Sequence, residues 1–238
     1  MTSLFRRIWT GRPPSPPRVF SNTNFERISA ACKIEEETFP GYFAARYYPV
    51  RIGDVFVSRY QVVGKLGYGA YSTVWLVRDL AQHRHVALKV FIRSQVMGRA
   101  ADHELNTYQH ITHVSTSSSH PGRKAVRSLL DSFRVSGPDG EHHCLVHPPL
   151  WDSVKGFLGR NPVRRLPPVV LRVVLQQLLM ALDFLHSECH LIHTDLKMDN
   201  IMLGAGDNST FDEFEQQELG AHHREKKSTA ASSIFLVS

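Results

Sequence analysis

The sequence has little cysteine and none of the paired spacings that bind metals or form redox centres. Its 238 residues include three cysteines, Cys32, Cys144 and Cys189, which lie far apart. An odd number of widely spaced cysteines indicates neither a disulfide framework nor a zinc site. We therefore expect the protein to occupy a reducing intracellular compartment, the cytoplasm and/or the nucleus.

Long apolar runs are also lacking. No uninterrupted run reaches the roughly 18 apolar residues that cross a bilayer, and the N-terminal residues lack the apolar core of a secretory signal, so we expect no membrane partner. Acidic residues are absent before Glu26, whereas four arginines precede it: Arg6, Arg7, Arg12 and Arg18. That bias is typical of an organelle transit peptide, which we keep as an alternative to a disordered basic tail.

No charge of one sign dominates the chain. The formal net charge is +6, with 21% charged and 42% hydrophobic residues, which is an ordinary globular composition with enough apolar residues for a core. A modest basic excess that is spread along a chain is usually a solvated surface. We expect no direct nucleic-acid binding.

The chain divides into four parts by composition. Residues 1–45 are rich in Pro, Ser and Arg and predict a disordered basic tail. Residues 46–149 contain short β-branched and aromatic runs separated by turns, and a helix is predicted around residues 99–110. Together these patterns predict a five-stranded antiparallel sheet with one helix.

Residues 150–218 have helical character. One helix is predicted to end near Gly159, and a longer one to begin after Pro167 and Pro168. Apolar residues occupy most of the circumference of this longer helix, which predicts burial on nearly all sides. Residues 219–238 are interpreted as a further tail. The fold class is α+β, with a strand lobe followed by a helical lobe and a ligand site between them.

Two features in the strand lobe can hold phosphate. Gly67 and Gly69 lie between two predicted strands, where glycine allows a tight turn and close approach to phosphate oxygens; alone, this pattern is weak and also fits a plain hairpin. Lys89 is flanked by apolar residues on the third strand, so its ammonium must either extend to solvent or meet an anion, for which a phosphate is a good partner. Glu104, on the predicted helix, is the expected ion-pair partner, with Asp102 as a less favoured substitute.

A third feature has the residue types that phosphoryl transfer requires. The run from His193 to Leu203 places Asp195, Lys197 and Asn200 in a polar loop after the long helix. A carboxylate can orient an attacking hydroxyl, a cation can lie near the transferred phosphate, and an amide oxygen can bind Mg²⁺. The order of glycine loop, lysine, glutamate and polar loop matches the protein-kinase signature.

Three stretches carry a family resemblance. LGYGAYSTVWL, VALKV and IHTDLKMDNIM resemble the motifs of eukaryotic protein kinases, and specifically those of SR-protein kinases, because Ser72 replaces a third glycine and Thr194 replaces the usual arginine. The resemblance implies a two-lobe fold, ATP and Mg²⁺ as cofactors, Asp195 as catalytic base, Lys197 at the γ-phosphate, and Asn200 at the metal. It also implies nucleotide contacts from Leu66, Gly67, Gly69, Ser72, Val74, Lys89, Glu104 and Asn200.

The family implies serine phosphorylation in Arg-Ser-rich proteins such as splicing factors, without need of a phosphorylated activation loop because of Thr194. The kinase triplet Asp-Phe-Gly, which supplies a Mg²⁺ ligand, does not occur among the 238 residues. The sequence therefore reads as a kinase domain truncated before this triplet, with an incomplete helical lobe. Impaired transfer and exposed apolar surface are expected consequences.

Three alternatives remain open at the level of sequence. The chain can be a catalytically inactive module that binds nucleotide or a partner. It can be a phosphotransferase of the aminoglycoside type, although His-Thr-Asp-Leu-Lys disfavours this interpretation. It can also hold a metal through histidines such as His110 and His113, although scattered surface histidines are the favoured explanation.

Overall fold

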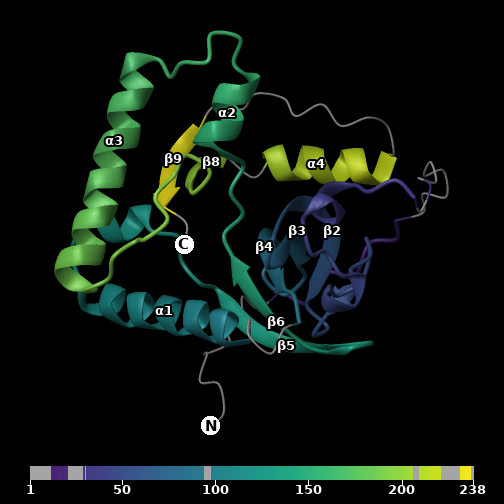
Figure 1. Cartoon of the computed structure of the whole chain (residues 1–238). Helices are drawn as coiled ribbons and strands as arrows, with labels where there is room; N and C mark the ends of the chain where they lie inside the picture. The colour runs from purple at the N-terminus through teal and green to yellow at the C-terminus, as the bar shows by residue number, and fades with distance from the viewer. Residues whose placement is uncertain are drawn as a thin grey trace.

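The computed structural model of the chain describes residues 12–20, 29, 31–93, 98–205, 209–220 and 231–236. A strand lobe, on the right of Figure 1, is followed along the chain by a helical lobe with the long helix α3 on the left. This arrangement confirms the α+β fold class. The short helical turns span Glu35–Thr38, Ala44–Arg46, Pro121–Ala125 and Phe184–Glu188.

The strand lobe is built on one antiparallel sheet of six strands, in the order β1-β2-β3-β4-β6-β5. In that order the strands span Val55–Phe56, Tyr60–Gly69, Ser72–Asp79, Arg84–Phe91, Gly140–His147 and Asp131–Gly137. All five strands predicted from the sequence are present. The strand β1 was missed because a pair of residues shows no alternation that a pattern can reveal.

Burial explains why these residues form strands. Aromatic and β-branched side chains from β2, β3 and β4 pack together with at most 2% of their surface exposed; they are Tyr60, Val62, Val77, Val86 and Val90, with Leu88 between them. Such side chains fit the half-buried surface of a pleated sheet. Helix α1, Gly98–Ser117, covers part of the sheet through Ala101 and Tyr108, which contact Phe91 and Leu145.

The helical lobe begins with helix α2, Val154–Arg160, whose N-terminus is capped by Ser153. The Ser153 hydroxyl oxygen accepts a hydrogen bond from the Gly156 amide at 3.0 Å. Helix α3 spans Pro168–Asp183 and starts with a proline, whose missing N–H costs nothing in the first turn. Phe184 continues α3 and is completely buried.

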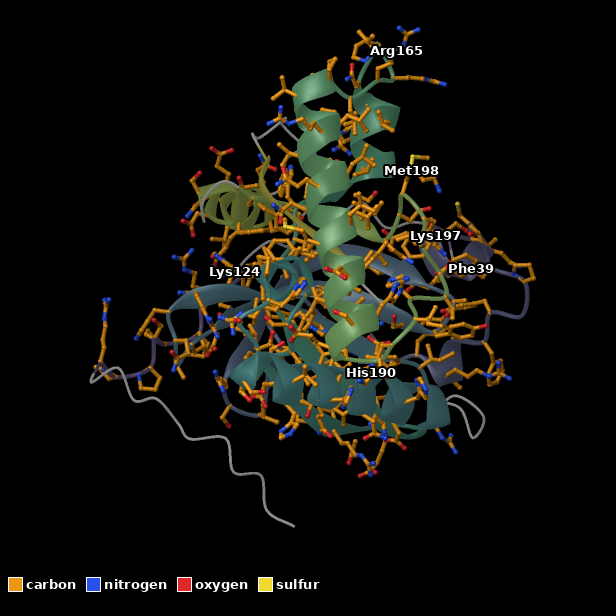
Figure 2. All side chains as sticks on the ribbon, turned by 90° about the vertical axis from the view of Figure 1, so that its left-hand side faces the viewer. Phe39, Lys124, Arg165, His190, Lys197 and Met198 are labelled. Atoms are coloured by element: carbon orange, nitrogen blue, oxygen red, sulfur yellow. The ribbon has the colours of Figure 1, made fainter. Side chains whose placement is uncertain are left out.

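The prediction that α3 is buried on nearly all sides is wrong for the described residues. Val174 and Ala181 are buried, but six apolar side chains spread around most of the helix circumference are exposed: Val169, Val170, Leu171, Val173, Leu175 and Leu179. Figure 2 shows α3 in front, with no other helix across it in that view. Apolar composition indicates what a helix can bury and not what covers it.

By length and composition, the segment Pro168–Glu188 is also apolar enough to cross a membrane, with 22% of its most apolar window buried. The core helix of a soluble protein can have the same length and composition, so one such helix is weak evidence for a membrane span.

A second, three-stranded sheet has the order β7-β8-β9. Its antiparallel strands are Asp152–Ser153, Ile201–Ala205 and Ala231–Leu236. The tail predicted over residues 219–238 therefore includes a strand, and Leu236 is buried with Ile201 and Leu203. Residues 221–230 and 237–238 lie outside the described residues.

Helix α4, Ser209–Gly220, follows β8 in the chain but lies on the strand lobe, across β2 and β3 in Figure 1. Phe211 and Phe214 pack against Val63 and Leu76. Gly64 makes room for this contact, since an added Cβ would lie 2.7 Å from the Phe214 ring. An element that follows the helical lobe in the chain thus becomes part of the strand-lobe core.

Glu215 of α4 is a buried carboxylate with 2% of its side chain exposed. His85 lies 2.8 Å away through Nε2, and Arg18 and Arg78 form ion pairs with it at 3.0 and 3.5 Å. Burial alone would raise the pKa of Glu215, but the His85 hydrogen bond and the two arginine charges lower its pKa overall. The ionised form is therefore the one that stabilises the docked helix.

We expect the Glu215 carboxylate to make the free energy of unfolding depend on pH. Because the folded pKa of Glu215 lies below its ordinary value of 4.5, its contribution is present above pH 4.5 and is lost as the pH falls through the folded pKa. The difference in free energy of unfolding between parent and Glu215→Gln should narrow as the pH is lowered, in urea titrations at several pH values. Glu141→Gln, an exposed control 3.8 Å from Arg134, should show no such narrowing.

The N-terminal residues differ from the uniform disordered tail predicted over residues 1–45. Residues 12–20 lie against the strand lobe, where the Ser15 amide donates to the Leu80 carbonyl at 2.8 Å. Phe20 packs on the cluster that holds α4. Lys65 of β2 binds both Glu35 and Glu36 at 2.5 Å. Residues 1–11 and 21–28 lie outside the described residues.

Candidate active site

The glycine-containing turn is a hairpin between β2 and β3. Gly69 pairs with Ser72, and Gly67 pairs with Val74, after a register shift that bulges β2 between Lys65 and Gly67. A Cβ at Gly67 would meet no atom within 4 Å, so the space above this residue is open. Leu66 is half-buried, and Ser72 is buried. The hairpin therefore offers open backbone beside an apolar floor, which suits a nucleotide.

Strand pairing places three predicted nucleotide contacts in one row. Val74 of β3 pairs with Gly67 on one side and with Lys89 of β4 on the other. Directly paired residues point to the same face of a sheet, so Val74 and Lys89 lie on the face that carries the Gly67 turn. The row extends to Leu145 of β6. The sheet register thus joins positions that are 22 residues apart in the sequence.

Lys89 has the partner that the sequence predicted. Its Nζ donates to both carboxylate oxygens of Glu104 on α1, each at 2.7 Å, and both side chains are 18% exposed. The alternative partner, Asp102, instead lies 3.8 Å from Arg134 and 3.6 Å from His143. The Lys89 ammonium also lies 4.8 Å from the centre of the Phe91 ring, a cation–π contact that the sequence analysis missed. These contacts fix the ammonium while leaving it partly accessible.

The polar loop brings its three predicted residues together. The Lys197 ammonium lies 2.7 Å from Asp195 Oδ2. The Asn200 side-chain amide donates to the Asp195 backbone carbonyl at 2.8 Å and to Oδ2 at 3.0 Å. Because Nδ2 makes these bonds, the amide oxygen of Asn200 is the atom of that side chain that can bind a cation. Figure 2 labels Lys197 to the right of α3 in that view, next to the label of Met198.

Electrostatics keep the Asp195 carboxylate ionised. The hydrogen bond from Lys197 and then that from Asn200 lower the pKa of Asp195, and the same pairing raises the pKa of Lys197. Asp195 is 64% and Lys197 52% exposed, so solvent and substrate can reach both. An ionised and accessible carboxylate is able to orient a hydroxyl group and accept its proton.

The three groups of site residues are each assembled locally: the glycine hairpin, the Lys89–Glu104 pair, and the Asp195 loop. The first two share the sheet, and the third follows α3 and precedes β8. His110, considered as a metal ligand, instead hydrogen-bonds the Cys189 carbonyl at 2.9 Å and joins α1 to the helical lobe. The fit to ATP and Mg²⁺ rests on the paired lysine, the open glycine turn and the Asn200 oxygen.

Together, the strand lobe with its lysine–glutamate pair and the aspartate–lysine–asparagine loop define a protein kinase domain. Residues 60–212 match the protein kinase domain family, and the chain belongs to this family.

Its similarity is to SR-protein kinases in particular. A serine/threonine protein kinase of Aspergillus fumigatus is 48% identical over 182 residues, which are 76% of this chain and 45% of that protein. SRSF protein kinase 3 of Sus scrofa is 36% identical over 82% of this chain and 33% of its own length. Protein kinase dsk1 of Schizosaccharomyces pombe is 39% identical over 72% and 31%. The matched region is thus less than half of each of these relatives, and the chain is SR-protein-kinase-like.

Proposed function

We propose that the chain functions in ATP-dependent transfer of a phosphoryl group to serine in Arg-Ser-rich proteins. The observation that carries this proposal is the hydrogen-bonded set of Asp195, Lys197 and Asn200, together with the Lys89–Glu104 pair. The preference for Arg-Ser-rich substrates is supported by the similarity to SRSF protein kinase 3.

The residues have separate roles in this reaction. ATP supplies the phosphoryl group, and Mg²⁺ neutralises its charge when both are bound. Lys89, positioned by Glu104, binds the α- and β-phosphates, and the amides around Gly67 and Gly69 approach them. Asp195 orients the substrate hydroxyl and accepts its proton. Lys197 stabilises the transferred group, and the Asn200 oxygen would hold the Mg²⁺ ion.

The direct test is transfer of phosphate from ATP to a peptide of Arg-Ser repeats, with an Arg-Ala repeat peptide as control. Incorporation into the serine peptide that depends on Mg²⁺ supports the proposal. Nucleotide binding without transfer supports the second candidate, an inactive nucleotide- or partner-binding module.

Removal of the lysine charge should abolish nucleotide binding. In thermal unfolding followed by fluorescence, we expect the parent chain to gain about 2.7 kcal/mol when Mg-ATP exceeds its dissociation constant about 100-fold. Lys89→Met should lose this gain, because it removes the ammonium but keeps an apolar stem in the sheet. Lys155→Met is the matched control, since Lys155 is 63% exposed and binds Asp199 in the helical lobe. Equal stabilisation of both variants by Mg-ATP would contradict the role of Lys89.

A further inference from the structure

Residues 12–20 form a strap across the strand lobe and α4. In addition to the Ser15 amide bond, the Arg18 amide donates to Gln61 Oε1 at 2.8 Å, and Gln61 Nε2 donates to the Arg18 carbonyl at 2.7 Å. Arg18 also forms the ion pair with Glu215 of α4 at 3.0 Å. The strap therefore contacts both the sheet and the helix that is docked on it.

Ser15 has the sequence surroundings of a modification site. It lies in the run Arg-Pro-Pro-Ser-Pro-Pro-Arg, residues 12–18, in which proline follows the serine directly and arginine follows three positions later. Serines in this pattern are typical substrates of proline-directed serine kinases. The Ser15 side chain is half-buried, and its Oγ lies 2.7 Å from His83 Nδ1. The part of the strap around Ser15 is held by polar contacts to Leu80 and His83, so it can detach locally to reach such an enzyme.

The cavity beside Ser15 is polar and rich in basic groups. Its volume is about 160 Å³, and its basic lining residues are Arg18, Arg78, His83, Arg84 and His85. The carboxylates that line it are Asp79, Asp212 and Glu215. A cavity of this size has room for a phosphate group and several waters.

Arg84 is the least compensated of these arginines. Its ion pair with Asp79 is 4.0 Å long, and Asp79 already accepts two hydrogen bonds of 2.7 Å from Arg59. Arg84 is also 45% exposed at its side chain. The other ring nitrogen of His83, Nε2, is buried and has no hydrogen-bond partner among the described residues. Arg84 is therefore an accessible and weakly paired cation in the cavity that Ser15 also lines, and His83 contacts the Ser15 hydroxyl through Nδ1.

A cation is a poorer occupant of this region than an anion. His85, Asp212 and Glu215 have the residue types of a metal site. However, His85 contacts Glu215 through Nε2 and Asp212 through Nδ1, so both of its ring nitrogens already have carboxylate partners. Arg18 and Arg78 already supply positive charge to Glu215 at 3.0 and 3.5 Å. A metal ion would have to displace these arginines.

We propose that Ser15 is a phosphorylation site and that its phosphate is received in this cavity by His83 and Arg84, which fastens the strap over α4. A proline-directed kinase transfers the γ-phosphoryl group of ATP: the bond from Ser15 Oγ to phosphorus forms, the bond to ADP breaks, and the hydroxyl proton leaves to the base of that kinase. Phosphoserine carries close to two negative charges and can form one to three charge-assisted hydrogen bonds opposite basic side chains.

The rate of trypsin cleavage within the strap reports how firmly the strap is held on the strand lobe. Trypsin can cleave after Arg18, which precedes Val19, whereas Pro13 blocks cleavage after Arg12. With phosphoserine incorporated genetically at position 15, cleavage of the 238-residue chain after Arg18 should slow by on the order of tenfold, the effect of about one charge-assisted hydrogen bond. Combining phosphoserine with Arg84→Ala should restore the rate. Arg134→Ala, an exposed arginine on β5, is the control that should leave the slowing intact.

Two outcomes would contradict the proposal that this cavity binds the phosphate. One is an unchanged cleavage rate after Arg18. The other is slowing that persists in Arg84→Ala, which would mean that the phosphate acts on trypsin alone. Access to Ser15 is tested separately, by incubating the Asp195→Asn chain with a proline-directed kinase and ATP and measuring the intact mass. One added phosphoryl group that is absent in the additional variant Ser15→Ala supports the proposal, and no addition overturns it. Using Asp195→Asn keeps this test independent of the activity proposed for the chain itself.

Discussion

Asp195→Asn should reduce the initial rate of phosphoryl transfer to an Arg-Ser peptide by about 100-fold to 10,000-fold, the range that a positioned general base contributes. Asparagine keeps the size of the side chain and can hydrogen-bond Asn200, but it cannot accept the substrate proton. Because Asp195 is 64% exposed, the thermal unfolding midpoint should change little. The loss should appear in kcat rather than in the nucleotide-dependent rise of that midpoint.

Asp199→Asn is the matched control for this substitution. Asp199 lies in the same loop, is 44% exposed, and pairs with Lys155 at 3.0 Å, so its loss removes a negative charge without touching Asp195. Its transfer rate should remain within a few-fold of the parent rate, since exposed ion pairs contribute about 1 kcal/mol at most. A surviving rate in Asp195→Asn, or an equal loss in both variants, would assign the proton acceptor elsewhere.

Gly122→Ala should strongly lower the free energy of unfolding. Gly122 lies in the turn Pro121–Ala125 that packs under α3, and an added Cβ would overlap the backbone carbonyl of Met180. A backbone atom within a helix cannot yield as a flexible side chain can, so the free energy of unfolding should fall by about 1–3 kcal/mol or more. Urea denaturation of the 238-residue chain measures this change.

Gly159→Ala tests whether the loss comes from the overlap. Gly159 lies in α2, and an added Cβ there would meet no atom within 4 Å. Replacing an unobstructed helical glycine with alanine usually stabilises by about 0.5–1 kcal/mol. The two substitutions should therefore change stability in opposite directions, and a similar loss in both would mean that α3 does not press on Gly122.

Local patterns predicted the strand lobe well, because each strand of seven or more residues alternates or buries its side chains in a way that the sequence records. The Lys89–Glu104 pair and the Asp195 loop were predicted for a similar reason: their residue types have few other uses at those spacings. The register that joins Gly67, Val74 and Lys89 depends on the Lys65/Gly67 bulge, which no sequence pattern marked.

The docking of α4 and the strap could not be predicted in this way. The sequence of α4 reads as an acidic stretch, and nothing local shows that Phe211 and Phe214 pack on a sheet far away in the chain. Likewise, the composition of residues 12–20 indicates a tail, whereas a few contacts with Leu80, Gln61 and Glu215 hold it in place. Such long-range contacts depend on tertiary structure that propensities do not include.

The position of α4 has a consequence for turnover. Three residues connect Ala205 at the end of β8 to Ser209 at the start of α4, so the helix cannot move far from the helical lobe while its phenylalanines stay buried in the strand lobe. Release of ADP from kinases commonly requires relative motion of the two lobes, and such steps often limit the rate of a catalytic cycle. For the transfer proposed above, this three-residue connection would limit the amplitude of that motion, and a longer connection would be expected to speed product release.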